Sequence, residues 1–198
     1  MASFLRAGLH HDLQGLAQQA RPEGVGSTPT CQLVILDSAN AMVLRMSGSN
    51  NVQVRRLGPP DRDLARMTFD LLADVFGEKR DRLSDAYLDE LLGRPWFLVF
   101  VATVGGLTVG GLTAHVLPMT AYEGAEIFIF DVAVEDDYQR RGVGRRLLAA
   151  VRDEASGLGT SSMFVVADNE DAGGLAFYRA LGGVASGVTL FQFKVTES

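Results

Sequence analysis

The sequence predicts a mixed α/β (α+β) domain built on a single, largely antiparallel sheet flanked by helices. Two observations carry this prediction. Runs rich in β-forming residues recur between residues 52 and 195, and two of them are joined through a short glycine turn, as neighbouring antiparallel strands are. Segments whose apolar residues recur at helical spacing lie between these runs and end at glycine. A sheet with helices packed on it buries both kinds of apolar face.

The first part of the domain is expected to contain one strand and two helices. Residues 52–57, VQVRRL, alternate as a strand does. A helix over residues 64–76 follows, with Asp61 or Asp63 as its cap. A shorter helix is predicted over residues 84–93, which begin with serine and end with glycine.

The remaining elements are predicted by the same two periodicities. In chain order they are a hairpin over residues 96–118 with its turn at 104–106, a strand over 125–134, a helix from 143 to 155, a strand over 161–167, a helix over 172–183 and a final strand over 187–195.

Residues 1–50 differ from the rest of the chain because they lack a sustained period and are rich in turn and linker residues. We expect a poorly ordered leader, or an added extension, ahead of a folded domain over residues 51–198. The single cysteine, Cys31, allows no internal disulfide and fits a reducing compartment. No run approaches the roughly 18 apolar residues of a membrane span, and the N-terminus does not resemble a signal peptide. A cytoplasmic protein without a membrane partner is therefore expected.

The distribution of charge along the chain indicates what kind of partner it binds. Residues 1–50 contain three basic and three acidic residues, so the whole net charge of −6 lies in residues 51–198. An acidic domain of this kind argues against nucleic acid as a partner and fits a cationic small molecule. Acidity that only aids solubility is the alternative.

One short stretch has the opposite charge. Residues 137–148, DYQRRGVGRRLL, contain four arginines and two glycines and pass into an apolar helical pattern. Glycine allows the backbone to approach a ligand closely, and the first N–H groups of a helix have no acceptor within it. These groups and the helix dipole favour phosphate, to which arginine adds suitable donors. The stretch therefore indicates a pyrophosphate site, with a solvated basic helix start as the alternative.

Known motifs narrow this interpretation. The Rossmann fingerprint needs a third glycine where Leu147 stands, and a P-loop over Gly106 and Gly111 would need lysine where Leu112 stands. Gln139 to Gly144, QRRGVG, matches the Q/R-x-x-G-x-G/A signature of the Gcn5-related N-acetyltransferases (GNAT), and AFYRALG over 176–182 is similar to a second segment of that superfamily. The chain resembles this superfamily over residues 52–195, which implies its acetyltransferase fold and identifies 51–198 as the N-acetyltransferase domain.

The resemblance narrows further to the aminoglycoside 3-N-acetyltransferases of type I. It is carried by HVLP at 115–118, EIFIFDVAV at 126–134 and VVADNEDAGGLAFYRALG at 165–182. Many members of the superfamily have asparagine seven residues before the tyrosine, where this chain has Asp171. The resemblance implies transfer of an acetyl group from acetyl-CoA to an aminoglycoside amine, expected at the 3-amino group, and hence antibiotic resistance. A homodimer is expected by analogy.

The resemblance also implies roles for individual residues. The amine attacks the thioester directly, with Asp131 as the base or as the anchor of a relay water, and Glu126 as the alternative base. An unperturbed carboxyl pKa of about 3.9 fits an amine poorly, so a raised pKa or a relay is implied. Tyr178 takes the position of the general acid that protonates the CoA thiolate. The cofactor-binding residues implied are Val132, Ala133, Val134, Gln139, Arg140, Arg141, Gly142, Val143, Gly144 and Arg145.

Alternatives remain for several of these roles. Asp131 could instead only pair with a substrate ammonium, and Tyr178 could only hold a helix to the sheet. Carboxylates suit a polycationic amine, and the candidates for binding it are Glu123, Asp131, Asp168, Glu170 and Asp171, with Glu126 at the strand start. Asp168, Glu170 and Asp171 could equally supply turn and cap residues. His115 is expected to pack or hydrogen-bond within a strand, and no metal site is expected.

Two other functions are compatible with the sequence. The same fold could acetylate another small amine, such as a polyamine or a peptide α-amine. The protein could also bind acyl-CoA as a sensor without turnover, although a pure binder needs neither Asp131 nor Tyr178.

Overall fold

The computed structural model describes residues 51–191 except 80 and 161, together with residue 193. The leader predicted over residues 1–50, and Cys31 within it, lie outside the described residues. Within them the elements follow the predicted order closely. They are β1 (Gln53–Leu57), α1 (Arg62–Phe76), α2 (Asp85–Leu92), β2 (Phe97–Val104), β3 (Leu107–Pro118), β4 (Ala125–Val134), α3 (Val143–Gly157), β5 (Ser162–Val165) and α4 (Ala172–Ala180), with single 3-10 turns at Pro59–Asp61 and Asp136–Tyr138.

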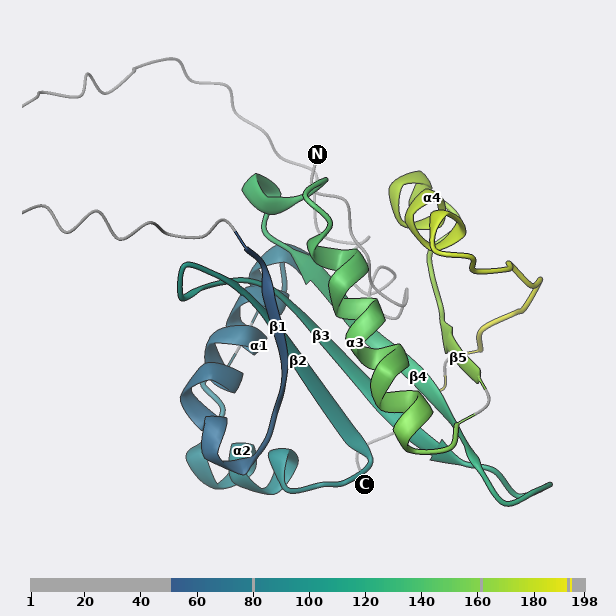
Figure 1. The fold of residues 1–198 in the computed structure, drawn as a ribbon, viewed down its shortest axis with the longest axis horizontal. Helices are drawn as coiled ribbons and strands as arrows, with labels where there is room; N and C mark the ends of the chain where they lie inside the picture. Colours follow the sequence, from purple (N-terminus) through teal and green to yellow (C-terminus); the bar gives the residue numbers. More distant parts are fainter. Residues whose placement is uncertain (1–50, 80, 161, 192, 194–198) are drawn as a thin grey trace, which may run out of the picture.

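One five-stranded sheet in the order β1-β2-β3-β4-β5 forms the centre of the domain (Figure 1). Its first three pairs are antiparallel and the last, β4 with β5, is parallel. The predicted largely antiparallel sheet is therefore confirmed. The β2–β3 hairpin turns at Gly105 and Gly106, whose positive φ angles of 59° and 86° are conformations that glycine adopts without strain.

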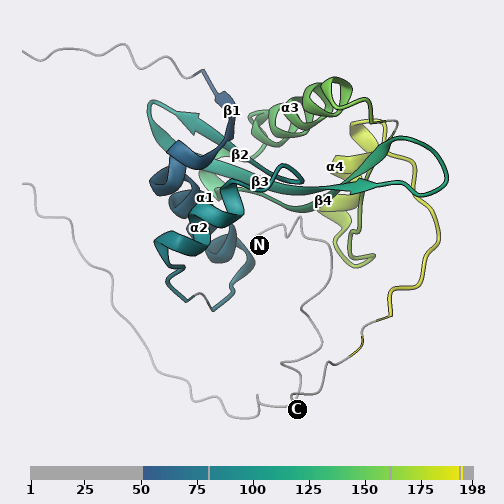
Figure 2. The ribbon, with the colours of Figure 1, turned by 90° about the horizontal axis from the view of Figure 1, so that it is seen from below.

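Helices cover both faces of this sheet, with α1 and α2 on one side and α3 on the other (Figure 2). The larger core lies under α3, where Leu147 and Val151 are fully buried against strand residues such as Ile129 and Val132. Two smaller clusters join the opposite face to α1 and α2. Two adjacent glycines in β3 let both layers approach closely, because a Cβ at Gly110 would meet α3 and a Cβ at Gly111 would lie 2.5 Å from Thr68 of α1.

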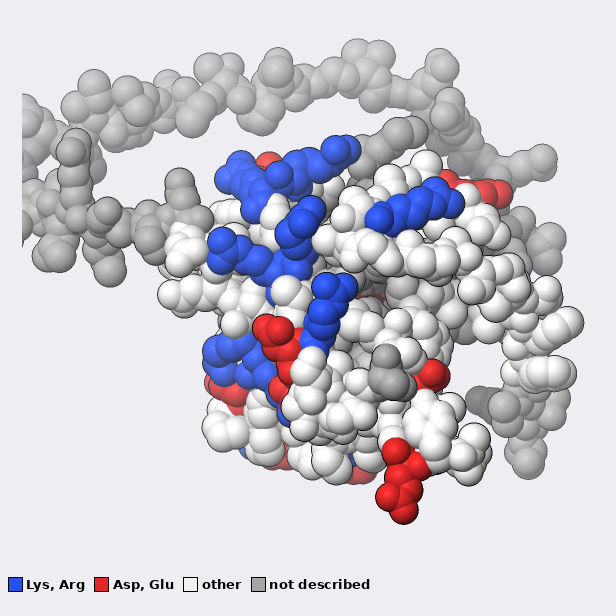
Figure 3. Space-filling model, turned by 45° about the vertical axis from the view of Figure 1, so that its right-hand side comes forward, with Lys and Arg blue, Asp and Glu red and all other residues white. Residues whose placement is uncertain are grey.

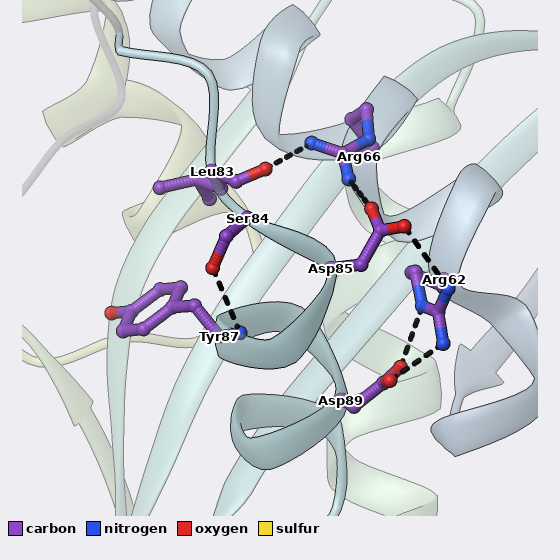
Figure 4. A network of polar contacts seen from close by, with 7 residues as sticks. All are labelled: Arg62, Arg66, Leu83, Ser84, Asp85, Tyr87 and Asp89. Carbon is purple, nitrogen blue, oxygen red and sulfur yellow. Dashed lines mark hydrogen bonds and ion pairs between the residues drawn. The ribbon is translucent and has the colours of Figure 1, made fainter.

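The helices α1 and α2 are held together by arginines (Figure 4). Arg62 donates to both carboxylate oxygens of Asp89 at 2.6 and 2.5 Å, and Arg66 donates to Asp85 at 2.6 Å and to the Leu83 carbonyl at 2.5 Å. Two-point contacts of this kind fix direction as well as distance. Ser84 caps α2 as predicted, accepting from the Tyr87 N–H at 3.2 Å. Asp61, one of the two predicted caps, is the N-cap residue of α1, but its side chain accepts from Arg55 and the Gly58 N–H and makes no capping bond to the helix.

The final strand predicted over residues 187–195 is wrong for the part of it that the structure describes. Residues 187–191 form no strand, and their apolar side chains are exposed, by 78% at Val188 and 74% at Phe191. An alternating pattern measures how well side chains fit a half-buried pleated surface. A strand also needs a hydrogen-bonded neighbour, and this segment pairs with no strand in the described part of the chain.

Candidate active site

β4 and β5, the last two strands of the sheet, separate partway along β4. Pairing of β4 with β5 runs only from Glu126 opposite Ser162 to Ile129 opposite Val165, while β4 continues to Val134. Beyond Ile129, no strand of the described chain pairs with β4 on its β5 side. The result is a gap in the sheet, where the β4 backbone after Ile129 has no strand partner on one edge within the described residues.

The backbone groups that face this gap can be assigned from the ladder. The Glu135 N–H donates to the Val109 carbonyl of β3 at 3.0 Å, and groups pointing to one neighbour alternate along a strand. The N–H groups of Val132 and Val134 therefore point away from β3. The Val134 carbonyl fits this assignment, because it accepts from the Gln139 side chain at 3.1 Å. Residues 132–134 are buried, with at most 5% of each whole residue exposed.

The predicted glycine-arginine turn leads from this gap into α3. Gly142 is the N-cap of α3 with φ of 81°, a left-handed conformation that disfavours other residues. No side chain of the described residues caps the helix, and its first turn contains no acidic residue. Its first N–H groups therefore remain available to an anion. Gln139 fixes the turn through its bonds to Val134 and, at 2.9 Å, to Asp136.

The arginines of this turn have different environments. Arg140, with φ of 60°, and Arg141 are exposed, and the Arg141 guanidinium lies 5.4 Å from the centre of the Tyr138 ring. Arg145 is exposed as well. Arg146 instead donates to the Val52 carbonyl at 2.9 Å and so joins α3 to the start of β1. Figure 3 shows basic side chains gathered over the upper part of one face, where α3 begins, with few acidic ones among them.

Gly144, the second glycine of the motif, has a packing role. A Cβ there would lie 3.0 Å from the Phe177 ring of α4, tighter than nine in ten real Cβ contacts, so the ring would have to shift. The absence of a side chain lets α4 approach the start of α3. This contact places Tyr178, the neighbour of Phe177, in the partly buried layer against the α3 core.

Tyr178 is a partly buried residue with a buried hydroxyl. Its hydroxyl is inaccessible to solvent and has no hydrogen-bond partner among the described residues. Burial, followed by the negative charge of Asp171, raises the pKa of the Tyr178 phenol well above its ordinary value. The phenol therefore keeps its proton at neutral pH. A buried hydroxyl without a partner costs free energy, so such groups commonly serve a ligand.

Asp131 lies on the face of the sheet opposite to Tyr178. It is two residues past Ile129, the last residue of β4 that pairs with β5. Its carboxylate accepts from the Thr113 hydroxyl at 2.7 Å, and Thr113 is buried. Thr113 lies directly opposite it on β3, next to an irregularity in the register. Asp131 and Tyr178 thus lie on the two sides of the sheet, near the place where it opens.

The other predicted acids lie at the start of β4, in the turn before it and in the loop after β5. Glu126 is five residues before Asp131, at the far end of β4, and accepts from Ser162 at 2.6 Å. Glu123 is exposed in the turn between β3 and β4. Asp168 accepts from the N–H of Glu170 at 2.9 Å in the loop after β5. The structure therefore does not bring Glu126 together with Asp131.

Asp171 has a local role as well. It is the N-cap of α4 and accepts from the Gly174 N–H at 2.9 Å. The loop from Asp168 to Asp171 follows β5 directly, at the end where the gap opens. Turn and cap roles for Asp168 and Asp171 are therefore present, and the negative charge of Asp171 also acts on Tyr178.

A row of aromatic side chains was not predicted. Phe97, His115, Phe128 and Phe164 are directly opposite one another across β2 to β5. His115 packs among rings, as expected, and its burial lowers its pKa while the charge of Asp131 opposes the shift. The sequence contains the alternating phenylalanines of β4, but only the strand register aligns them with the other rings.

A sheet that opens beside an uncapped helix N-terminus, with a carboxylate and a phenol on its two sides, suits a transferase that uses a phosphorylated acyl carrier. The model of the acetyltransferase (GNAT) family matches residues 65–182, and the chain belongs to this family. It is therefore an acetyl-transferring enzyme that uses acetyl-CoA. The predicted superfamily and fold are confirmed.

Several solved structures are similar to the chain. An aminoglycoside acetyltransferase from an uncultured soil metagenomic sample, in complex with trehalose, is 31% identical with a TM-score of 0.71, covering 75% of this chain and 99% of that one. The same enzyme in complex with sisomicin is 30% identical with a TM-score of 0.70, covering 73% of this chain and 97% of that one.

A curated relative has a different substrate. The alanine N-acetyltransferase of ribosomal protein bS18 from Escherichia coli strain K12 is 37% identical over 57 residues, which are 29% of this chain and 38% of that protein. The match thus spans well under two thirds of that relative. In the part of the chain that the structure describes, no helix is long and apolar enough to cross a membrane. The same residues contain no cluster of three potential metal ligands.

Proposed function

We propose that the chain transfers the acetyl group of acetyl-CoA to an amino group of an aminoglycoside, the 3-amino group, by direct attack of the amine. The observation that carries this proposal is the half-buried Asp131, held by Thr113 beside the gap in the sheet and on the opposite face from Tyr178. The similarity to aminoglycoside acetyltransferases over nearly their whole length supports the substrate class.

The residues present fit the cofactor. The uncapped first turn of α3 and the exposed Arg140, Arg141 and Arg145 suit the phosphates of CoA. The N–H groups of Val132 and Val134 suit the amide-bearing arm and the thioester carbonyl, whose oxygen gains negative charge during transfer. When bound, acetyl-CoA supplies the activated acetyl thioester.

Asp131 is proposed to accept a proton from the attacking ammonium, which has no free lone pair until that proton leaves. The bond from Thr113 of β3 fixes the position of the carboxylate on its face of the sheet. Tyr178 is proposed to donate its phenolic proton to the departing thiolate, because the phenol is protonated at neutral pH and its hydroxyl has no hydrogen-bond partner among the described residues. Asp168 and Asp171, with Glu170, attract the further ammonium groups of the substrate.

The test is acetyl-CoA-dependent thiol release by the purified chain with gentamicin, sisomicin, kanamycin and spermidine in parallel. Turnover of the aminoglycosides with little reaction of spermidine is expected, and nuclear magnetic resonance of the product should place the acetyl group on the 3-amino nitrogen. Acetylation at another amine would overturn the regiochemistry alone. Failure with every aminoglycoside, at concentrations where acetyl-CoA binds, would overturn the substrate class.

Resistance is a further consequence of this activity. Expression of the chain in a susceptible bacterium should raise the inhibitory concentration of gentamicin, and the Asp131→Asn variant should not. Equal inhibitory concentrations for the wild type and an empty vector would contradict the resistance role.

A peptide α-amine is the second candidate, favoured by the curated relative that acetylates the alanine of a ribosomal protein. A short peptide with N-terminal alanine belongs in the same thiol-release experiment. A kcat/KM for the peptide above that for every aminoglycoside would favour this candidate.

A further inference from the structure

A strip of aromatic rings crosses the sheet on the face that carries α1 and α2. We define the aromatic strip as the in-register residues Phe97, His115, Phe128 and Phe164, with Phe130 beside them. The ring centres of Phe97 and His115 are 5.2 Å apart, and those of Phe128 and Phe164 are 5.1 Å apart and nearly parallel, at 19°. Phe130 meets His115 and Phe128 edge to face at 5.8 Å. The rings therefore form one continuous surface over four strands.

The two ends of the strip differ. At the Phe97 end, Trp96 stacks on His115 at 5.9 Å, and the guanidinium of Arg94 lies 5.0 Å from the Trp96 ring centre. That end already holds a cation of the protein. At the other end, Phe164 is 42% exposed on the last strand of the sheet, and Phe128 and Phe130 are half-buried. A ligand has access to the phenylalanine end.

Carboxylates lie on both sides of this accessible end. Asp131 follows Phe130 on β4, and its face of the sheet is shared with Thr113 and His115 of β3. Glu126 precedes Phe128 by two residues, so its side chain is on the same face, where it accepts from Ser162. Along a strand that rises about 3.3 Å per residue, the two acids are roughly 15 Å apart. An apolar ring surface thus lies between two negative groups.

We infer that the phenylalanine end of the aromatic strip, Phe128, Phe130 and Phe164, binds the ring faces of a multi-ring amino sugar and is a specificity determinant of the transfer reaction. This inference rests on the proposed function. Aromatic faces attract ammonium groups and the apolar C–H faces of saturated rings. Asp131 receives the reacting amine, and Glu126 attracts an ammonium of a distal ring. A linear polyamine has no ring face, and a single ring cannot span both acids.

The test compares sisomicin with 2-deoxystreptamine, a single ring that carries two of the same amines. In the Phe128→Leu variant the KM for sisomicin, and its Kd by calorimetry without acetyl-CoA, should rise about tenfold, the size expected for one aromatic contact with a cation. The values for 2-deoxystreptamine and the KM for acetyl-CoA should change less than twofold. Trp96, the single tryptophan, offers a fluorescence signal for the same titrations.

Controls separate binding from stability. Phe100→Leu removes a buried ring from the opposite face of the sheet and should lower the Tm without changing the sisomicin Kd. If Phe128→Leu does not fold, Phe164→Leu removes a more exposed ring and should weaken sisomicin binding severalfold. Unchanged sisomicin binding in the folded phenylalanine variants, with normal acetylation by the wild type, would overturn only the inference that the aromatic strip binds the substrate. A wild type that neither binds nor acetylates any aminoglycoside would overturn the proposed function, and the strip's ligand with it.

Discussion

The two sides of the candidate site differ in how the chain builds them. The cofactor side consists largely of one turn, residues 139–145, whose backbone amides, glycines and arginines are neighbours in the sequence. The amine side is assembled from β2, β3, β4 and β5, which bring Thr113, Asp131 and the aromatic strip together only through their register. The proposed phosphate site is thus a local property of the chain, whereas the proposed site for a multi-ring amine depends on the register of several strands.

The largest expected effect is at Asp131, where the two sides meet. Asp131→Asn should lower kcat/KM for the amine by about 10²–10⁴-fold near neutral pH, because a general base is lost. The KM for acetyl-CoA should stay close to that of the wild type. Steady-state thiol release measures both constants. Thr113→Ser, which keeps the donor to the carboxylate, is the matched control, and near-normal turnover of Asp131→Asn would remove this residue from the mechanism.

Tyr178 tests the cofactor side of the same reaction. Tyr178→Phe should lower kcat by about 10²-fold, because the thiolate loses its proton donor while the ring packing is retained. Circular dichroism and the Tm should be nearly unchanged, since the hydroxyl has no partner among the described residues. Full activity in this variant would mean that another group, such as water, protonates the thiolate.

The arginines near the start of α3 should differ in function although they are close in sequence. Arg140 and Arg141 are expected to bind acetyl-CoA, whereas Arg146 is expected to stabilise the fold. Replacing both Arg140 and Arg141 by alanine should raise the KM for acetyl-CoA about tenfold through loss of two exposed phosphate contacts, and high salt should reduce the difference. Arg146→Gln should instead lower the Tm, because that side chain bonds the Val52 carbonyl. Equal KM values for the double variant and the wild type would place the phosphates elsewhere.

The acidic loop should respond more weakly and on the other substrate. The double variant Asp168→Asn and Asp171→Asn keeps the turn and cap acceptors, since asparagine caps helices well, but removes two charges. The KM for a polycationic amine should rise about threefold, while that for acetyl-CoA should change less. Equal changes in both constants would argue against a role in substrate binding.

The smallest effect concerns His115 in the aromatic strip. Burial lowers its pKa from 6.5 in the folded state, so between the two values the unfolded chain binds more protons. The stabilising contribution is thus complete above pH 6.5 and is lost as the pH falls toward the folded-state pKa. Urea unfolding at pH 7.5 and 5.5 should show a larger loss of stability in the wild type than in His115→Phe. An identical loss in both proteins would mean that His115 does not contribute.

Most of the fold could be predicted because the periodicities of residues 52–183 agree with what the sheet and helices need. Gly77 ends α1 in a left-handed conformation, and Ser84 caps α2, as their sequence positions indicate. The prediction over residues 187–195 failed in its described part because β-forming residues do not supply a pairing partner. The role of Gly144 was also out of reach, because its neighbour Phe177 is distant in the sequence.

By itself the sequence determined the order of the elements from β1 to α4, the family and the glycine-arginine turn, since each depends on residues close together in the chain and on their local conformations. The tertiary structure alone decided that β4 and β5 separate after Ile129, that Asp131 and Tyr178 lie on opposite sides of the sheet, and that four aromatic side chains align. These features depend on strand register and on helix packing. A shift of one residue would turn every side chain of a strand to the other face, and no local pattern records the register.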